Sequence, residues 1–117
     1  MNHKIITGIA SFGMSGKVFH APLLNSHKGF HLKTIVERSK NEASALYPDI
    51  EIVRAFDTLL QDKEIELVII NTPDYMHYEM ALAAIQAGKN VVVEKPFTQT
   101  LEQAYSLIEA ANKKVSW

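Results

Sequence analysis

The chain of 117 residues contains no cysteine, which excludes disulfide bonds, thiolate metal sites and a cysteine nucleophile. It also has little excess charge, with a net charge of −1, so nothing favours nucleic acid or an anionic membrane as a partner. No apolar run approaches the ~20 residues of a membrane span, and the first run ends by Ser11, too soon for a signal peptide core. These absences predict a cytoplasmic protein that binds neither membranes nor nucleic acid.

Apolar runs alternate with helix-like segments along the chain, which predicts an α/β fold: a doubly wound parallel sheet with helices on both faces. Strands are expected at residues 5–10, 30–36, 52–54, 67–70 and 91–93, and residues 115–117 are placed to begin a sixth. The helices are expected at 18–24, from a Ser39 cap to Leu46, at 57–60, from an Asp74 cap through Ile85, and from Thr98 or Thr100 to about Asn112. With no linker or repeat, residues 1–117 are expected to be one domain.

Glycine is missing from one position where a phosphate-binding loop needs it. After the first predicted strand the chain reads S-F-G-M-S-G, comprising Ser11, Phe12, Gly13, Met14, Ser15 and Gly16, whereas the dinucleotide fingerprint G-x-G-x-x-G begins with glycine. A helix that starts here directs its free N–H groups and the positive end of its dipole at an anion. Ser11 is tolerated if its φ angle stays negative and otherwise crowds the turn. The sequence therefore predicts a phosphate loop with one substitution.

Glu37 follows the second predicted strand, 21 residues after Gly16, close to the ~20 expected for the acid that binds the adenosine ribose. A carboxylate there accepts hydrogen bonds from both ribose hydroxyls and repels a 2′-phosphate, which favours NAD. Arg38 and Ser39 favour NADP, because a guanidinium pairs with a phosphate and a hydroxyl donates to it. A solvated charge pair after a strand is the alternative interpretation. The choice between NAD and NADP stays open.

Parallel sheets bind ligands beyond the carboxyl ends of their strands, near the point where the strand order reverses. Two further segments follow strands in this way: Asn71-Thr72-Pro73 and Glu94-Lys95-Pro96. A lysine at a strand end, beside a carboxylate and before a proline, is well placed to bind a substrate hydroxyl or carbonyl and to help move its proton during hydride transfer. Judged from this tripeptide alone, an ordinary surface lysine is the better interpretation of Lys95.

A family resemblance is carried by four segments: GMSGKVFHAPLL, VERS, NTPDYMHYEMALAAIQAGKNVVVEKPF and TLEQAYSLIEAANKK. Together they resemble the N-terminal half of the Gfo/Idh/MocA oxidoreductases, the relatives of glucose-fructose oxidoreductase and inositol dehydrogenase. The resemblance implies a Rossmann fold, NAD or NADP as cofactor, a sugar, polyol or inositol-like substrate, and full-length relatives that are homo-oligomers. Members continue into a second α/β domain, so it also implies that this chain alone binds dinucleotide with little or no turnover.

The resemblance also implies roles for individual residues. Lys95 is the catalytic or substrate-binding lysine, His77 faces the nicotinamide side, and Glu94 lies near the nicotinamide ribose. The predicted cofactor-binding set is Ser11, Phe12, Gly13, Met14, Ser15, Gly16, Glu37, Arg38, Ser39, Asn71, Thr72, Pro73, His77, Glu94, Lys95 and Pro96.

Two other hypotheses remain. The first is a non-catalytic domain that senses dinucleotide or pairs with a partner chain through the same cleft, because the catalytic set is incomplete. An adenosylmethionine-binding fold fits less well, since its glycine pattern differs and EKP has no role in it. Among the other residues, His20 is expected to cap or pack at the end of the first helix, and Met76 and Met80 to lie in the core. The dispersed histidines predict no metal site.

Overall fold

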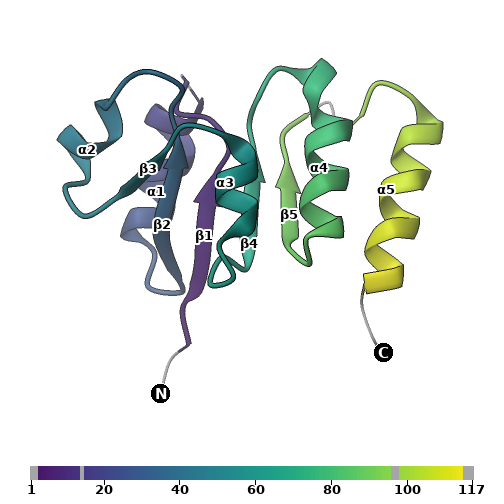
Figure 1. The fold of residues 1–117 in the computed structure, drawn as a ribbon, viewed down its shortest axis with the longest axis horizontal. Coiled ribbons are helices and arrows are strands. Elements are labelled where there is room, and N and C mark those ends of the chain that lie inside the picture. The colour runs from purple at the N-terminus through teal and green to yellow at the C-terminus, as the bar shows by residue number, and fades with distance from the viewer. Residues whose placement is uncertain (1–2, 14, 96–97, 115–117) are drawn as a thin grey trace.

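Five parallel strands form a single sheet in a computed structural model that describes residues 3–13, 15–95 and 98–114. The strand order is β3-β2-β1-β4-β5, which reverses between β1 and β4 (Figure 1). The bounds are β1 (Ile5–Ile9), β2 (Phe30–Val36), β3 (Glu51–Val53), β4 (Leu67–Ile70) and β5 (Asn90–Val93). The predicted doubly wound parallel sheet is confirmed, and each of its five expected strands lies within a residue or so of its predicted position.

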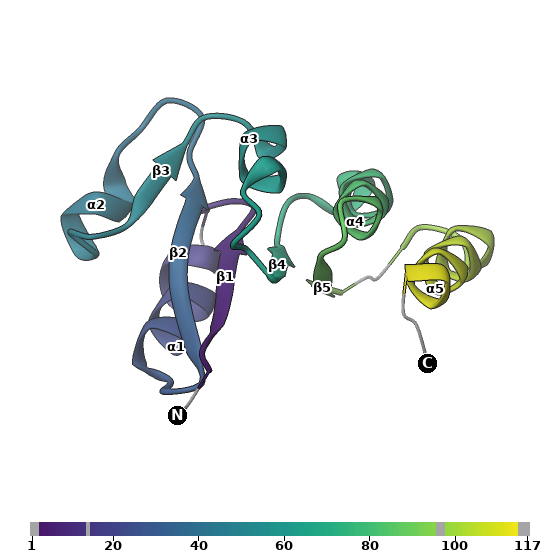
Figure 2. The ribbon, with the colours of Figure 1, turned by 60° about the horizontal axis from the view of Figure 1, so that its bottom comes forward.

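Helices cover both faces of this sheet. They are α1 (Ala21–Ser26) after a π-helical turn η1 (Gly16–His20), α2 (Glu42–Leu46), α3 (Phe56–Gln61), α4 (His77–Gln86) after a 3-10 turn η2 (Asp74–Met76), and α5 (Leu101–Lys114). Figure 2 shows α1 on one side of the sheet and α3 and α4 on the other. The last helix, α5, lies beyond β5 and packs on α4, to which the Tyr78 and Ser106 hydroxyls join it at 2.9 Å. Helices therefore lie on both faces of the sheet, as the doubly wound topology requires.

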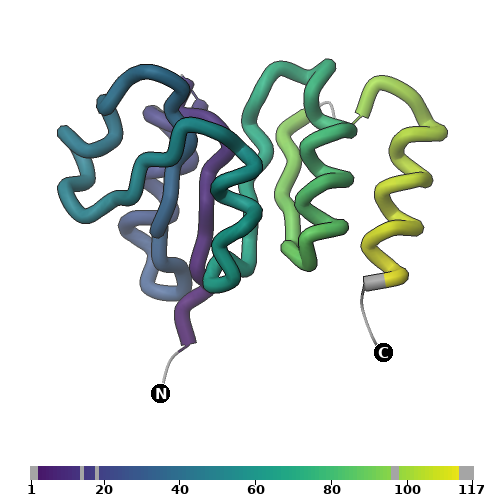
Figure 3. Tube along the Cα trace, viewed as in Figure 1, coloured from purple at the N-terminus to yellow at the C-terminus, as the bar shows by residue number. Residues whose placement is uncertain are grey.

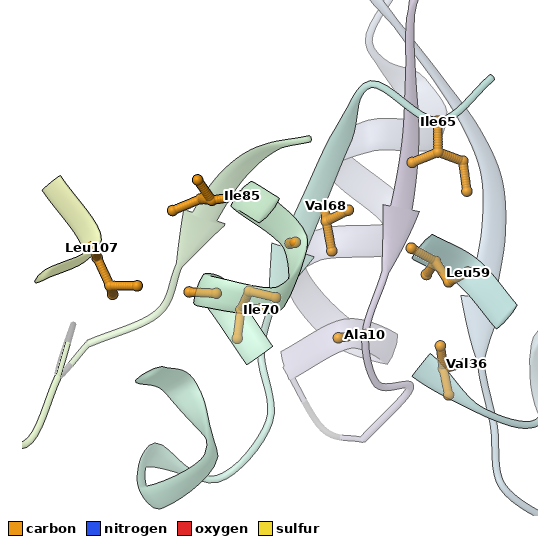
Figure 4. Close-up of a cluster of buried hydrophobic side chains, with 10 residues drawn as sticks. Ala10, Val36, Leu59, Ile65, Val68, Ile70, Ile85 and Leu107 are labelled. Atoms are coloured by element: carbon orange, nitrogen blue, oxygen red, sulfur yellow. The ribbon is translucent and has the colours of Figure 1, made fainter. Parts of the chain in front are cut away.

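The core is divided by the sheet into two clusters of buried side chains. Figure 4 shows the cluster on the α3 and α4 side, which extends from Leu59 of α3 past Val68 and Ile85 to Leu107 of α5. The other cluster joins Ile9 and Ile35 to the inner face of α1. Every residue of β4 is apolar because both faces of this central strand are covered, as its uniform sequence predicts.

The chain enters its first helix through a wide π-helical turn, and Pro22 gives a physical reason for it. Proline has no N–H to donate and its ring clashes with the carbonyl four residues earlier, so an ordinary α-turn is disfavoured. Instead the Ala21 N–H donates to the carbonyl of Gly16, five residues back. This π-turn immediately follows the glycine loop, so it sets the direction in which the side chains of η1, including His20, leave the backbone.

Two predicted helix caps are wrong. Ser39 does not cap α2: the helix begins after Asn41, and the Glu37 carboxylate accepts hydrogen bonds from its first amides. Asp74 does not cap α4, because residues 74–76 form the separate turn η2 and no side chain caps either start.

Two other helix ends agree with the sequence. Gly88 follows α4 with a φ of 84°, the left-handed conformation in which glycine carries no penalty. The last helix, α5, begins directly after Thr100, one of the two expected starting points, and Thr100 Oγ1 accepts the Gln103 N–H. The expected strand at 115–117 lies outside the described residues, as do Met14 and Pro96. In the part of the chain that the structure describes, no helix is long and apolar enough to cross a membrane.

Candidate functional site

A cavity of about 980 Å³ opens at the carboxyl ends of β1, β2 and β4, beside the reversal of strand order. The loops that leave β2 and β4 rise from this same edge of the sheet, at the top of Figure 3. Three of the predicted segments meet there. The cavity is lined by Ser11, Phe12, Gly13, Glu37, Arg38, Ser39, Thr72 and Pro73 of the predicted set, together with Ala10, Lys17, Val36, Lys40, Glu42, Arg54, Ala55, Phe56, Tyr75, Met76 and Met80.

The loop after β1 accommodates serine where the fingerprint has glycine. No non-glycine residue in the described ranges has a positive φ, so Ser11 meets the condition for tolerance. Its Oγ accepts the Gly13 N–H at 3.2 Å and closes a small turn. Gly16 is the constrained position instead, because a Cβ atom there would lie 2.5 Å from the Ser11 carbonyl oxygen and 2.9 Å from Asn71 Nδ2. Close packing of the helix start on β1 and β4 therefore requires glycine at 16.

Glu37 is buried at 7% exposure, and the start of α2 engages its carboxylate. Its two oxygens accept the N–H of Glu42 at 3.1 Å and of Ala43 at 2.6 Å. A negative charge at a helix N-terminus is stabilised by the helix dipole, so this carboxylate anchors α2 to the end of β2. Both oxygens are thus already hydrogen-bonded before any ligand is considered.

The residues after Glu37 present positive and polar groups to the cavity. Arg38, Ser39 and Lys40 are exposed and line it. Arg54 of the next loop donates to the carbonyl oxygens of Glu37 and Lys40, at 3.1 and 2.6 Å. Arg54 therefore fixes the backbone of this segment, while the Arg38 guanidinium forms no ion pair within the described residues.

Asn71, directly after β4, has an unused acceptor. Its Nδ2 donates to the Ser11 carbonyl at 2.7 Å, which fixes the orientation of the amide. The residue is only 8% exposed, and its buried Oδ1 accepts no hydrogen bond from the described residues. A buried acceptor without a partner is costly, and a hydroxyl or N–H of a bound molecule would satisfy it. Asn71 does not line the cavity, but its free acceptor beside the loop fits a ligand that donates a hydrogen bond at this point of the sheet.

His77 is buried next to the cavity and contacts the backbone of the loop after β4. Its ring is 1% exposed, and its Nε2 lies 2.7 Å from the Thr72 carbonyl oxygen, to which an Nε2–H donates. The Thr72 hydroxyl in turn donates to Met80 Sδ at 3.2 Å. His77 thus holds the turn that lines the cavity and does not itself line it, and its predicted place beside the nicotinamide stays a prediction.

Glu94 and Lys95 follow β5, outside the cavity lining. One Glu94 carboxylate oxygen lies 2.7 Å from His20 Nε2, so His20 reaches across from η1 instead of capping its own helix. Lys95 is exposed, and its ammonium forms no ion pair with any described residue. A cation held free at the carboxyl edge of the sheet is available to a ligand.

Sequence reasoning missed the apolar and basic walls of the cavity. Met76, expected in the core, lines the cavity together with Phe56; Met80 lines it too and also packs against the core, as expected. Their spacing of four residues gives a helix face but cannot say whether that face meets core or cavity. Lys17 pairs with Glu42 at 3.1 Å, and its ammonium keeps the pKa of that carboxyl below its usual value.

The reversal of strand order, the loop closed on Gly16 and the polar cavity beside it define a Rossmann-type dinucleotide-binding domain. The profile of the family described as "Oxidoreductase family, NAD-binding Rossmann fold" matches residues 5–116. The chain belongs to this family, Gfo/Idh/MocA, and its cofactor is NAD or NADP.

Relatives with curated names and solved structures agree with this assignment. The chain is 43% identical over 110 residues to scyllo-inositol 2-dehydrogenase (NADP(+)) IolW of Bacillus subtilis, covering 94% of this chain and 31% of that protein. A crystal structure of an oxidoreductase from Bacteroides fragilis superposes with a TM-score of 0.94 at 54% identity, covering 96% of this chain and 35% of that one. The yvaA oxidoreductase of Bacillus subtilis gives 0.93 at 41% identity, covering 97% and 33%. The chain spans about a third of the length of these relatives.

Proposed function

We propose that this domain binds NADP in preference to NAD and serves an oxidoreductase that acts on a sugar, polyol or inositol-like hydroxy compound. The observation that carries the cofactor choice is the engagement of Glu37. Because both of its oxygens accept amides of α2, Glu37 has less capacity to select a bare ribose. The exposed Arg38, Ser39 and Lys40 provide two cations and a hydroxyl for a 2′-phosphate.

The surrounding geometry supports the same choice. Arg54 holds the backbone of this segment through two carbonyl oxygens, so Arg38 and Ser39 project from a fixed support. A preorganised support reduces the entropy lost when a phosphate is bound. The name of the relative IolW includes NADP(+), and at 43% identity that is a further reason to expect NADP here.

The catalytic part of the proposal concerns Lys95. The nicotinamide, when bound, supplies a hydride acceptor for oxidation of an alcohol or a hydride donor for the reverse reaction. Lys95 stands at the carboxyl end of β5 and forms no ion pair with a described residue, so its ammonium can hold the substrate oxygen through a hydrogen bond. In the reductive direction the same ammonium donates the proton that the substrate oxygen takes up. We place the remaining substrate contacts in the part of the longer relatives that this chain does not match, and we expect the chain alone to turn over little substrate.

Calorimetric titration of the chain with NADPH and with NADH tests the cofactor assignment. We expect NADPH to bind at least about tenfold more tightly, the difference made by one good charge-assisted contact to the extra phosphate. Arg38→Ala should remove most of this preference and leave NADH affinity unchanged. Lys28→Ala is the matched control, because it deletes an exposed positive charge in the turn before β2, at the opposite edge of the sheet. Equal affinity for the two dinucleotides would contradict the NADP assignment, and no binding of either would contradict the function.

A further inference from the structure

We infer that His20 is a positioning residue that holds the Glu94 carboxylate in place for the half of the dinucleotide that lies over β4 and β5. The inference rests on the proposed function, since it concerns the same ligand. The contact between His20 and Glu94 joins the start of the first helix, beside the predicted phosphate loop, to the end of β5 just before Lys95.

The contact is close and partly shielded from water. His20 Nε2 lies 2.7 Å from Glu94 Oε2, with the two side chains 17% and 29% exposed. The residues are 74 positions apart and come from η1 and from the end of β5, so the bond closes across the sheet between β1 and β5. At this distance and burial the hydrogen bond is charge-assisted and resists screening better than a surface pair.

Local backbone structure aims the His20 ring at this contact. Pro22 disfavours an α-turn, and the resulting π-turn ends at His20, with the Ala21 N–H bonded to the Gly16 carbonyl. The same turn begins at Gly16, the residue packed against Ser11 and Asn71. A single rigid turn therefore joins the predicted phosphate loop to the ring that holds Glu94. Turns of this kind occur often at functional sites.

The place of Glu94 in the sheet indicates what it is held for. Arg38 and Ser39 fix the adenosine end of the proposed ligand on the β2 side, so the other half extends across the reversal point toward β4 and β5. Oε2 of Glu94 is occupied by His20, whereas Oε1 accepts no hydrogen bond from the described residues. That oxygen is a free acceptor for a ribose hydroxyl. A carboxylate already fixed by His20 loses less side-chain entropy when it binds one.

The test compares two ligands with the intact chain: NADPH, and adenosine 2′,5′-bisphosphate, which lacks the nicotinamide half. His20→Ala should weaken NADPH binding about tenfold, the loss typical of one charge-assisted hydrogen bond, and leave the bisphosphate affinity within about twofold. His20→Gln should restore most of the NADPH affinity, because a glutamine amide nitrogen reaches about as far as Nε2 and donates to the same carboxylate. Glu94→Ala should weaken NADPH binding to a similar extent, and the double variant should be no weaker than either. His31→Ala removes an exposed histidine on β2 and is the control.

The outcomes separate this inference from the proposed function. If the unchanged chain binds neither ligand, the proposed function fails and this inference fails with it. If the chain binds NADPH and His20→Ala binds it equally well, only the positioning role is wrong. Equal losses for the two ligands, or no recovery in His20→Gln, would mean that His20 supports the fold of the loop and does not position Glu94. The glutamine variant decides the question even where the alanine variant fails to fold.

Discussion

Gly16→Ala is the substitution that most severely tests the packing of the phosphate loop. The new Cβ would lie 2.5 Å from the Ser11 carbonyl oxygen, about 1 Å inside the ~3.5 Å at which nonbonded heavy atoms pack best. The Ser11 carbonyl is backbone and is also held by Asn71 Nδ2, so it cannot move aside cheaply. Overpacking of this kind costs up to about 3 kcal/mol. Alanine returns about 1 kcal/mol through its higher helix propensity.

The net expectation is a loss of about 2 kcal/mol in the free energy of unfolding, or roughly 8 °C in the melting temperature of a domain this size. Urea and thermal unfolding followed by circular dichroism measure both quantities. Gly13→Ala is the matched control, because a Cβ there would meet only Ser11 Oγ, at an ordinary 3.6 Å. We expect its stability to stay within about 0.5 kcal/mol of the unchanged chain. A Gly16→Ala variant as stable as Gly13→Ala would refute the close approach of η1 to the β1 loop.

Three other perturbations test the fold around the site. Glu37→Ala should destabilise the chain by about 1–2 kcal/mol in urea unfolding, because the first amides of α2 lose their acceptor; an unchanged midpoint would mean that this cap is not formed. The Lys33 ammonium keeps the pKa of Asp62 below 3.8, so the pair stabilises the fold above that pH and the effect disappears as acid protonates Asp62. Lys33→Met should therefore cost about 1 kcal/mol near neutral pH and much less near pH 2, and an equal cost at both pH values would exclude the ion pair as its source. Leu59→Ala should lower the free energy of unfolding by about 2–5 kcal/mol. A Cβ atom added at Gly8 would lie 2.9 Å from Leu59 Cδ1, so Gly8→Ala should destabilise the Leu59→Ala variant less than it destabilises the unchanged chain. Strictly additive losses in the double variant would contradict the contact between Gly8 and Leu59.

The regular elements could be predicted from the sequence because their signals are local. The run at β4 is uniformly apolar, Gly88 supplies the left-handed residue after α4, and Thr100 supplies an acceptor at the start of α5. Each pattern depends on neighbouring residues, and right-handed connections between parallel strands then predict helices on both faces of the sheet.

The contacts that shape the site could not be predicted, because they join residues far apart in the chain. The position of Ser39 predicts a helix cap, but the start of α2 is capped by the Glu37 carboxylate, which lies against the first amides of the helix in the folded chain. His20 and Glu94 are 74 residues apart, and no spacing rule relates them. The signal that was available is Pro22, which marks an irregular first helix and so a ring direction that an ideal helix does not give.

A crystal structure of the chain with bound NADPH would show the proposed cofactor contacts themselves. We expect the 2′-phosphate to lie against Arg38 and Ser39, with the Glu37 carboxylate still bonded to the amides of Glu42 and Ala43. Ribose hydroxyls bound to Glu37 with α2 released from it would contradict the preference for NADP, and a dinucleotide bound elsewhere than at the carboxyl edge of β1, β2 and β4 would contradict the proposed site.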